Sequence, residues 1–211
     1  MSGLDNMEIT INSYKHARLN FYRWRCDTAF VNKLALALAF AAFTGMSAQL
    51  RLYLPFTPVP ITGQVFAVLL GAVVLGKWYG GLSQVIYTAI GLAWIPWFAP
   101  KTGEAAFSSG GWSVIYGATG GYIIGFIVAA FIVGWLTDTY VKARELKALM
   151  PIFLLGIGII YTCGAAWLAF VIGIGIKNAV IFGILPFIAL DIAKALSSSF
   201  IASAVLPKEQ F

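Results

Sequence analysis

The chain has 211 residues, of which 60% are hydrophobic and only 10% charged, and it carries a formal net charge of +6 at pH 7. So few charged side chains cannot cover a soluble globule of this size, and most of the surface must therefore face lipid. The basic residues lie between apolar blocks, which argues against a nucleic-acid partner, and the two cysteines, Cys26 and Cys163, are too few for a disulfide framework or a zinc site.

Residues 1–29 are polar and basic, and they lack the short apolar core and cleavage site of a signal peptide, so we expect a retained cytoplasmic extension. A membrane span needs about 20 apolar residues. Six stretches within residues 30–206 come near this length, which predicts an all-α integral membrane protein with six transmembrane helices. The second stretch is short enough to tilt or bend, and residues 207–211 are expected to form a cytoplasmic tail. The six stretches are residues 30–50, 62–77, 79–99, 112–137, 151–175 and 180–206.

The first predicted span contains pairs of small residues four positions apart. Ala35 with Ala39, and Ala37 with Ala41, fit the small-xxx-small pattern that lets two membrane helices approach closely. These pairs are candidates for packing inside the bundle or for docking against another membrane subunit.

The connection after the first span, residues 51–62, is rich in proline. Its sequence, RLYLPFTPVPIT, holds three prolines that remove backbone donors and favour an extended path, which predicts a semi-rigid cap. Gln64 follows this loop and offers an amide donor and acceptor near the outer end of the second span. It is a candidate ligand-binding residue, and bonding to the free backbone groups of the helix end is the alternative.

Polar residues occur in the third span, and glycines recur in the fourth. Tyr87, with Ser83 and Gln84 nearby, is a second candidate for ligand binding, with an interhelical hydrogen bond as the alternative. Glycines at every fourth position of residues 117–125 allow a neighbouring helix to approach closely. The segment GATGGY, residues 117–122, lacks the Lys and Ser/Thr of a Walker A motif, so nucleotide binding is not predicted.

Two charged residues lie inside the last apolar run, ILPFIALDIAKALSSSFIASAVL. At this depth Asp191 and Lys194 each cost roughly 2.5 to 3.5 kcal/mol on insertion scales, and such groups persist where they meet a partner, water or a ligand. Three residues apart on a helix, they share a face and can point together into the bundle. Counted from Pro186, which favours a first helical turn, Asp191 lies about 7 to 8 Å below the outer end. Both are candidate site residues, and a mutual ion pair that only neutralises them is the alternative.

One catalytic arrangement is open to this sequence. Lys194 with Ser197 or Ser198 would supply the amine and hydroxyl of a Ser-Lys hydrolase. Serines, however, are ordinary small residues in membrane helices, and His16 lies in the N-terminal extension, away from any membrane site. The sequence therefore does not predict an enzyme, and it indicates no cofactor and no metal.

The basic residues also predict the orientation of the spans. With the N-terminus inside, ten lysines and arginines lie on the cytoplasmic side and three lie outside. Aromatic residues at span ends, such as Trp78, Trp94 and Trp135, agree with six spans. Both termini of this multi-pass plasma-membrane protein are therefore expected in the cytoplasm. The inner set is Lys15, Arg18, Arg23, Arg25, Lys33, Lys77, Lys142, Arg144, Lys147 and Lys208, and the outer set is Arg51, Lys101 and Lys177.

Three segments resemble, in order, the BioY family of biotin-binding S components of energy-coupling factor (ECF) transporters. They are PFTPVPITGQVFAVLLGAVVLG at residues 55–76, GATGGYIIGF at residues 117–126, and LPF followed by D-x-x-K-A at residues 185–195. The similarity covers about residues 31–206. It implies six helices, an outward-facing pocket, a capping loop, and a coupling membrane subunit with ATPases. That subunit would dock on Ala35, Ala37, Ala39 and Ala41.

By the same resemblance, Asp191, Lys194 and Gln64 are expected to bind biotin. The carboxylate of biotin suits Lys194, whereas its ureido group suits Gln64 and, in addition, Tyr87. Asp191 either accepts a ureido N–H or holds Lys194 charged and oriented. The family commonly has Pro-Gly just before this aspartate, where residues 189–190 of this chain are Ala-Leu. The predicted function is biotin uptake by a coupled S component, with a solitary carrier as the alternative.

Overall fold

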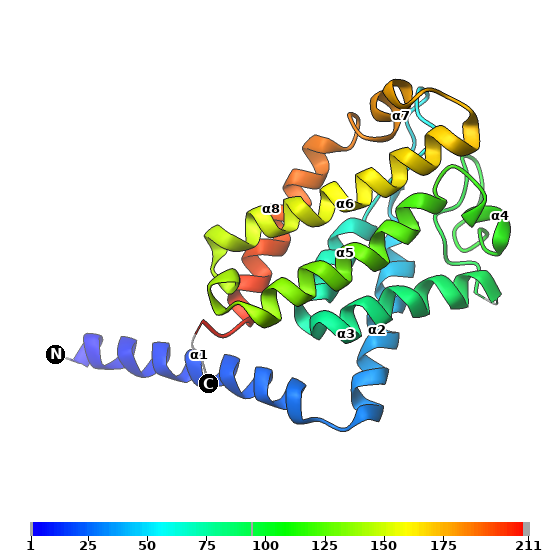
Figure 1. Ribbon diagram of the computed structural model, residues 1–211. Helices are drawn as coiled ribbons and strands as arrows, with labels where there is room; N and C mark the ends of the chain where they lie inside the picture. The colour runs from blue at the N-terminus through cyan, green and yellow to red at the C-terminus, as the bar shows by residue number, and fades with distance from the viewer. Residues whose placement is uncertain (1, 94, 209–211) are drawn as a thin grey trace.

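The computed structural model of the protein describes residues 2–93 and 95–208 (Figure 1). Trp94, one of the aromatic residues used to place the spans, and residues 209–211 of the predicted tail lie outside this description. The described chain is helical apart from its loops and one short two-stranded ribbon. In chain order the elements are α1 (Ser2–Asp27), α2 (Phe30–Gln49), β1 (Arg51–Leu52), β2 (Ile61–Thr62), α3 (Gln64–Ala93), α4 (Trp112–Ile115), α5 (Gly120–Thr139), the 3-10 helix η1 (Val141–Arg144), α6 (Leu146–Ile172), α7 (Ile176–Gly183) and α8 (Ile188–Val205).

Helix α3 folds back on itself at Gly76. This glycine has φ of 78° and ψ of −179°, which no helix accommodates and which favours a residue without a Cβ. A Cβ placed on Gly80 would lie 2.8 Å from the Cα of Ala72, although eight residues of straight helix span about 12 Å. The Gln64 amide likewise reaches the Tyr87 hydroxyl at 2.8 Å. Helix α3 is therefore two antiparallel segments joined at a tight turn.

Among the described residues, five helices are long and apolar enough to span a membrane, and the break at Gly76 divides one of them, α3, into two segments, so each of the six predicted stretches has a helical counterpart. The limits of the spans differ from the prediction. Residues 64–75 of α3 cover only about 18 Å, which agrees with the short second stretch. The predicted fourth span starts instead at Gly120, since α4 is a separate single turn. Pro186 lies in the turn between α7 and α8, before the N-cap residue Phe187, and not in the first helical turn. The predicted span of residues 180–206 is interrupted here, because a proline inside a helix removes a backbone donor.

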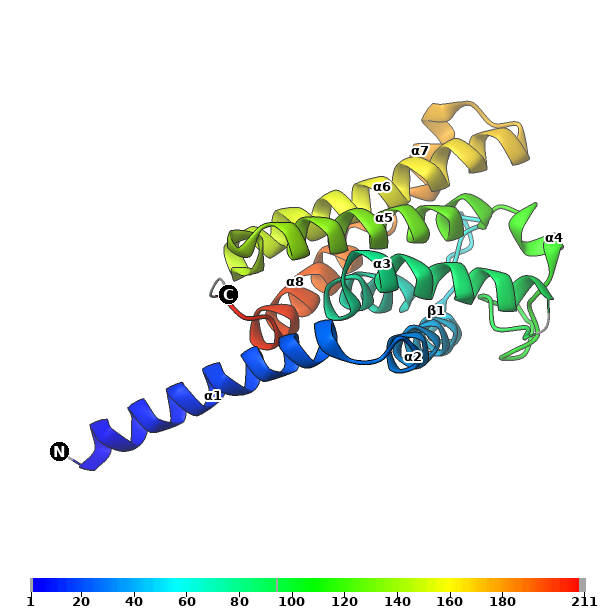
Figure 2. The ribbon, with the colours of Figure 1, turned by 60° about the horizontal axis from the view of Figure 1, so that its bottom comes forward.

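The N-terminal region is one 26-residue helix, where the sequence was interpreted only as a polar extension. Figures 1 and 2 show that α1 crosses the end of the bundle where the C-terminal segment also lies. We call this the α1 end. Helices α4 and α7 lie at the opposite end with β1 and β2, whose antiparallel register pairs Arg51 with Thr62 and Leu52 with Ile61. We call this the loop end.

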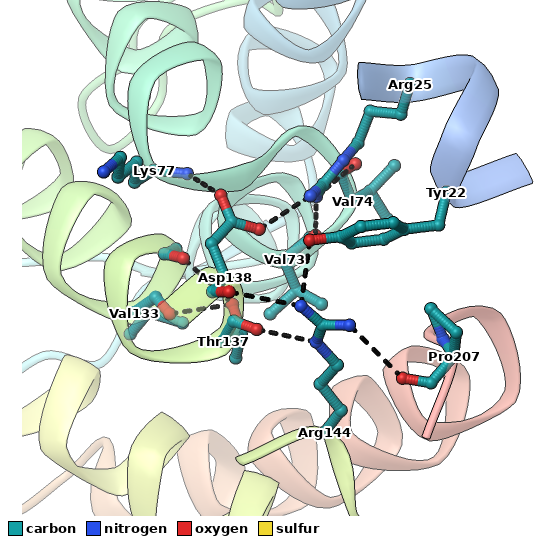
Figure 3. Close-up of polar contacts among 11 residues, drawn as sticks. Tyr22, Arg25, Val73, Val74, Lys77, Val133, Thr137, Asp138, Arg144 and Pro207 are labelled. Carbon is teal, nitrogen blue, oxygen red and sulfur yellow. Dashed lines mark hydrogen bonds and ion pairs between the residues drawn. The ribbon is translucent and has the colours of Figure 1, made fainter. Parts of the chain in front are cut away.

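Side chains of α1 and α5 satisfy the backbone at the break in α3 (Figure 3). The Arg25 guanidinium donates to the carbonyl oxygens of Val73 at 3.1 Å and Val74 at 3.4 Å, near the end of the first segment. The Asp138 carboxylate accepts from the backbone N–H of Lys77 at 3.0 Å, at the start of the second. An ion pair of 2.7 Å joins Arg25 to Asp138. Because helix ends leave backbone groups without intrahelical partners, these contacts make α1 part of the bundle.

Arg144 of η1 extends this cluster at the α1 end. It is 2% exposed, and its guanidinium donates to the Thr137 carbonyl and the Tyr22 hydroxyl, both at 2.8 Å. The Tyr22 ring lies between two cations, 4.4 Å from the Arg25 guanidinium and 4.5 Å from that of Arg144. Burial by itself lowers the pKa of Arg25, but the charge of Asp138 and its hydrogen bond, together with smaller contributions from Tyr22 and Cys26, raise it, and the net shift is upward. The Arg25 guanidinium therefore keeps its charge beside Asp138.

Helix α2 places the four predicted docking alanines on two different faces. Ala37 and Ala41 are fully buried inside the bundle, whereas Ala35 and Ala39 are exposed. Residues two positions apart point about 200° apart around a helix, so the four cannot share one contact face. The prediction is corrected accordingly: Ala37 and Ala41 pack internally, and only Ala35 and Ala39 are available to a partner.

Two glycines bring α5 close to α6. A Cβ on Gly121 would lie 2.2 Å from the Cβ of Trp167, and a Cβ on Gly125 would lie 2.9 Å from the Cα of Ile160. The expected close approach of a neighbouring helix is confirmed. It fixes the separation of two helices that carry pocket residues.

Candidate binding site

A pocket lies among the helices at the loop end of the bundle. It holds about 580 Å³ of empty space, its mouth included, which is within the usual range for small-molecule sites. Its walls come from α3, α5, α6 and α8, and Val59 and Pro60 of the proline-rich loop lie against it from the loop side. The lining is mostly apolar, with polar side chains at Thr62, Gln64, Thr119, Tyr122, Tyr161, Asp191 and Lys194.

The proline-rich loop is tied down over this pocket. The Thr57 hydroxyl donates to the carbonyl of Phe182 in α7 at 2.6 Å, and Val59 is 6% exposed. The β1–β2 pairing holds the two ends of the loop together. The predicted semi-rigid cap therefore corresponds to a loop with three separate attachments.

The structure brings the two predicted membrane charges together. Lys194 Nζ lies 2.5 Å from Asp191 Oδ1, and the Tyr161 hydroxyl donates to Asp191 Oδ2 at 2.7 Å. Asp191 is 3% exposed and lies in the first turn of α8, where the free N–H groups of a helix start favour a negative charge. Both carboxylate oxygens thus have donors, so the buried charge is compensated on two sides.

Both residues line the pocket, and Lys194 is the more exposed of the two. Its side chain is 19% exposed, compared with 5% for that of Asp191. An ammonium has three donors, and one of them is directed to Asp191. The remaining donors are suited to an anionic group of a ligand, and Asp191 holds the ammonium in place.

Gln64 lines the pocket, whereas Tyr87 does not. The Gln64 amide nitrogen donates to the Tyr87 hydroxyl at 2.8 Å, and its carbonyl oxygen accepts from Thr62 at 3.0 Å. Tyr87 is fully buried, stacked on Trp97 with ring centroids 5.5 Å apart and edge-on to Phe98 at 5.3 Å. Tyr87, predicted as a ligand-binding residue, thus lies in the core behind Gln64 and not in the pocket wall, where it can orient Gln64 but does not face a ligand. One amide hydrogen of Gln64 and an oxygen lone pair remain for a ligand.

Tyr161 and Tyr122 are site residues that the sequence did not reveal. Tyr161 bonds to Asp191, and the Tyr122 hydroxyl donates to the carbonyl of Gly183 at 2.7 Å. Each stands among mostly apolar neighbours in its helix. The face it presents depends on how α5 and α6 rotate against α8, which periodicity does not determine.

The hydrolase alternative finds no support in this geometry. Ser197 is exposed and donates to the carbonyl of Ala193 at 2.9 Å, whereas Ser198 is fully buried. Neither serine lines the pocket that Lys194 faces. A nucleophile would need to lie beside its base and within reach of a bound substrate. The pocket offers a cation, an amide and apolar walls, which suit the binding of a small molecule and not catalysis.

Comparison with known proteins decides the family. The family model described as BioY family matches residues 15–210. The chain belongs to the BioY family. Three relatives have 82–93% of their own length matched. They are the probable biotin transporter BioY of Pyrococcus horikoshii, 41% identical over 170 residues and 81% of this chain; that of Methanothermobacter thermautotrophicus, 37% identical over 153 residues and 67% of this chain; and the biotin transporter BioY of Thermotoga maritima, 38% identical over 149 residues and 71% of this chain.

One solved structure shares the architecture of this BioY chain. It is the S-component for biotin from an ECF-type ABC transporter, which is 26% identical, has a TM-score of 0.72, and matches over 82% of this chain and 89% of its own. The S-component-like helical bundle is therefore confirmed, and this family is one of transporters and not of enzymes. The family match begins at residue 15, so BioY similarity includes the second half of α1, which the motifs of residues 31–206 left out.

Proposed function

We propose that this protein captures biotin in the loop-end pocket and acts as the S component of an ECF transporter. The observation that carries the proposal is the Asp191–Lys194 pair in the wall of a capped, mostly apolar pocket, in a chain of the BioY family. The names of its relatives, which are biotin transporters, support the same substrate.

The chemistry of biotin matches the pocket group by group. Biotin has a carboxylate on an apolar tail, a ureido ring with two N–H donors and one acceptor, and a thioether ring. Lys194 supplies a cation for the carboxylate, and Gln64 supplies a donor and an acceptor for the ureido group. Apolar side chains such as Ile123, Phe126 and Phe187 surround the remainder. Of the two roles left open for Asp191, the contacts favour holding Lys194, because Tyr161 and Lys194 occupy its two oxygens.

Calorimetry of the purified protein tests the substrate. Biotin should bind at one site per chain, desthiobiotin more weakly because it lacks the thioether ring, and unrelated vitamins such as thiamine not at all. If folded protein gives no heat with biotin, or binds thiamine equally well, the proposed function is wrong.

In the proposed orientation the α1 end is cytoplasmic and the loop end faces outward. The excess of basic residues at the predicted inner positions supports this assignment. A biotin pocket covered by the proline-rich loop would then take its substrate from outside.

The proposed partners are a coupling membrane subunit and ATPase subunits. The chain has no nucleotide-binding motif, so energy for uphill uptake would come from elsewhere. Exposed Ala35 and Ala39 form a small-residue face on α2 where another membrane helix can approach closely. The solitary-carrier alternative is separated by measuring biotin uptake in cells without coupling subunits: full uptake by this chain alone would favour that alternative.

A further inference from the structure

Helix α1 is fastened to the end of α8, the helix that carries Asp191 and Lys194. The Tyr14 hydroxyl donates to the carbonyl of Ala204 at 2.5 Å, and Arg18 Nη2 donates to the carbonyl of Ser203 at 3.1 Å. The last carbonyls of a helix have no intrahelical partner, so these two bonds cap α8 from outside. They also fix α1 beside the C-terminal segment.

A basic groove lies between α1 and the segment that follows α8. It is lined by Lys15, Arg18 and Leu19 on one side and by Pro207 and Lys208 on the other. Three cationic side chains thus surround a small opening whose remaining walls are apolar. Pro207 is itself held from the bundle side, because its carbonyl lies 3.5 Å from Arg144 Nη1.

Arg18 has donor capacity that its protein contacts do not use. Its Nε is buried and has no hydrogen-bond partner among the residues that the structure describes. A buried donor without a partner is costly, and an anion in the groove would supply the missing acceptor. A guanidinium in particular suits the oxygens of a phosphate.

We propose that this groove binds the phosphate headgroup of an anionic phospholipid, with Arg18 and Lys208 as its principal ligands. The aromatic residues of α1 support a membrane source for the phosphate. Tyr14 is 49% exposed and Trp24 is 46% exposed, and such side chains prefer the headgroup level of a bilayer. In the proposed orientation α1 lies at the cytoplasmic leaflet, whose anionic lipids attract basic segments next to the membrane.

Native mass spectrometry of the full chain tests the proposal. Protein purified in phosphatidylcholine is titrated with phosphatidylglycerol, and the bound fraction gives an apparent affinity. Wild type should retain phosphatidylglycerol in preference to phosphatidylcholine. Arg18→Gln and Lys208→Gln should each weaken this binding about fivefold, and the double variant roughly 25-fold, if each charge contributes as basic residues near a membrane surface do.

Lys142→Gln is the matched control, because Lys142 is an exposed lysine of η1 at the same end and does not line the groove. It should leave the affinity unchanged. Arg18→Gln also removes the bond to the Ser203 carbonyl and could fold poorly for that reason. In that event Lys208→Gln alone still tests the proposal.

Two results would overturn the lipid assignment. One is unchanged phosphatidylglycerol retention by both groove variants. The other concerns thermal unfolding. If inorganic phosphate alone stabilises the protein as much as phosphatidylglycerol does, the groove is a site for free phosphate. None of these measurements uses biotin, so their failure is distinguishable from failure of the proposed transport function.

Discussion

At the scale of single residues, the site depends on pairs in which one side chain holds another. Asp191 and Tyr161 hold Lys194, and Tyr87 and Thr62 hold Gln64. Tyr87 lies in the core behind Gln64, whereas Asp191, Tyr161 and Thr62 share the pocket wall with the side chains that they hold. A substitution of Tyr87 should therefore affect ligand binding only through Gln64.

Lys194→Ala should weaken biotin binding roughly ten- to hundredfold, because it removes a charge-assisted contact worth on the order of 1.5 to 3 kcal/mol. Asp191 would keep its bond from Tyr161, so part of its compensation survives. Calorimetry with biotin and biotin methyl ester separates the causes. The ester lacks the carboxylate charge, so it should bind wild type more weakly and lose little more with the variant.

Lys177→Ala, which changes an exposed lysine at the loop end, should leave both affinities as they are. Equal losses for acid and ester in folded Lys194→Ala protein would show that Lys194 only neutralises Asp191.

Tyr87→Phe should lower biotin affinity about fivefold, the effect of losing one hydrogen bond of about 1 kcal/mol that orients Gln64. The ring keeps its packing against Trp97 and Phe98, so the core is preserved. The measurement is a double-mutant cycle with Gln64→Ala. Tyr87→Phe should add nothing once Gln64 is absent, and additive losses would mean that Tyr87 acts on the ligand by another route.

At the scale of elements, α3 connects the pocket to α1, and α2 divides its faces between the bundle and the surface. The first half of α3 carries Gln64 at its loop end and is held at its other end by Arg25 of α1. Helix α2 packs one alanine face into the bundle and leaves the other exposed. In α2, the face that the bundle covers contributes to stability, whereas the exposed face is open to a partner helix.

Ala39→Leu and Ala41→Leu should have different consequences, although they make the same change two residues apart. Ala39 is exposed, so the larger side chain should spare stability and biotin binding but reduce transport by blocking a coupling subunit. Ala41 is fully buried, so overpacking should destabilise the protein by about 1 to 3 kcal/mol. Thermal unfolding and biotin uptake distinguish the two. Normal uptake by well-expressed Ala39→Leu protein would remove support for docking at this face.

At the scale of the whole molecule, the pocket and the α1 cluster lie at opposite ends of one bundle. Val59 and Pro60 of the proline-rich loop line the pocket, and α7 lies at the same end of the bundle (Figure 1). At the other end, α1 and η1 bring the buried Arg25 and Arg144 together (Figure 3). This placement at opposite ends suits the proposed function, in which substrate enters from one side of the membrane. Its direction relative to the cell is open to a direct test.

Cysteine labelling should place position 101 outside and position 142 inside. In a background without Cys26 and Cys163, a membrane-impermeant maleimide should label Lys101→Cys in intact cells and label Lys142→Cys only after permeabilisation. Labelling of Lys142→Cys from outside would reverse the proposed orientation.

The sequence by itself determined the class of protein, indicated about six membrane segments, and singled out Asp191 and Lys194 as candidate site residues. Low charge with long apolar runs leaves lipid as the only suitable surroundings, and charges as isolated as Asp191 and Lys194 stand out at membrane depth. Gln64 was found because it follows the proline-rich loop directly. These inferences rest on local composition, which does not depend on how the helices pack.

Only the tertiary structure decided which residues face the pocket and which lie behind it. It placed Tyr87 in the core, brought Tyr161 to Asp191 across 30 positions of sequence, and divided the alanines of α2 between two faces. It also joined α1 to the break at Gly76 through Arg25. In a chain whose spans are apolar on every side, periodicity cannot specify helix rotation, which is set by close packing and by the few buried polar contacts.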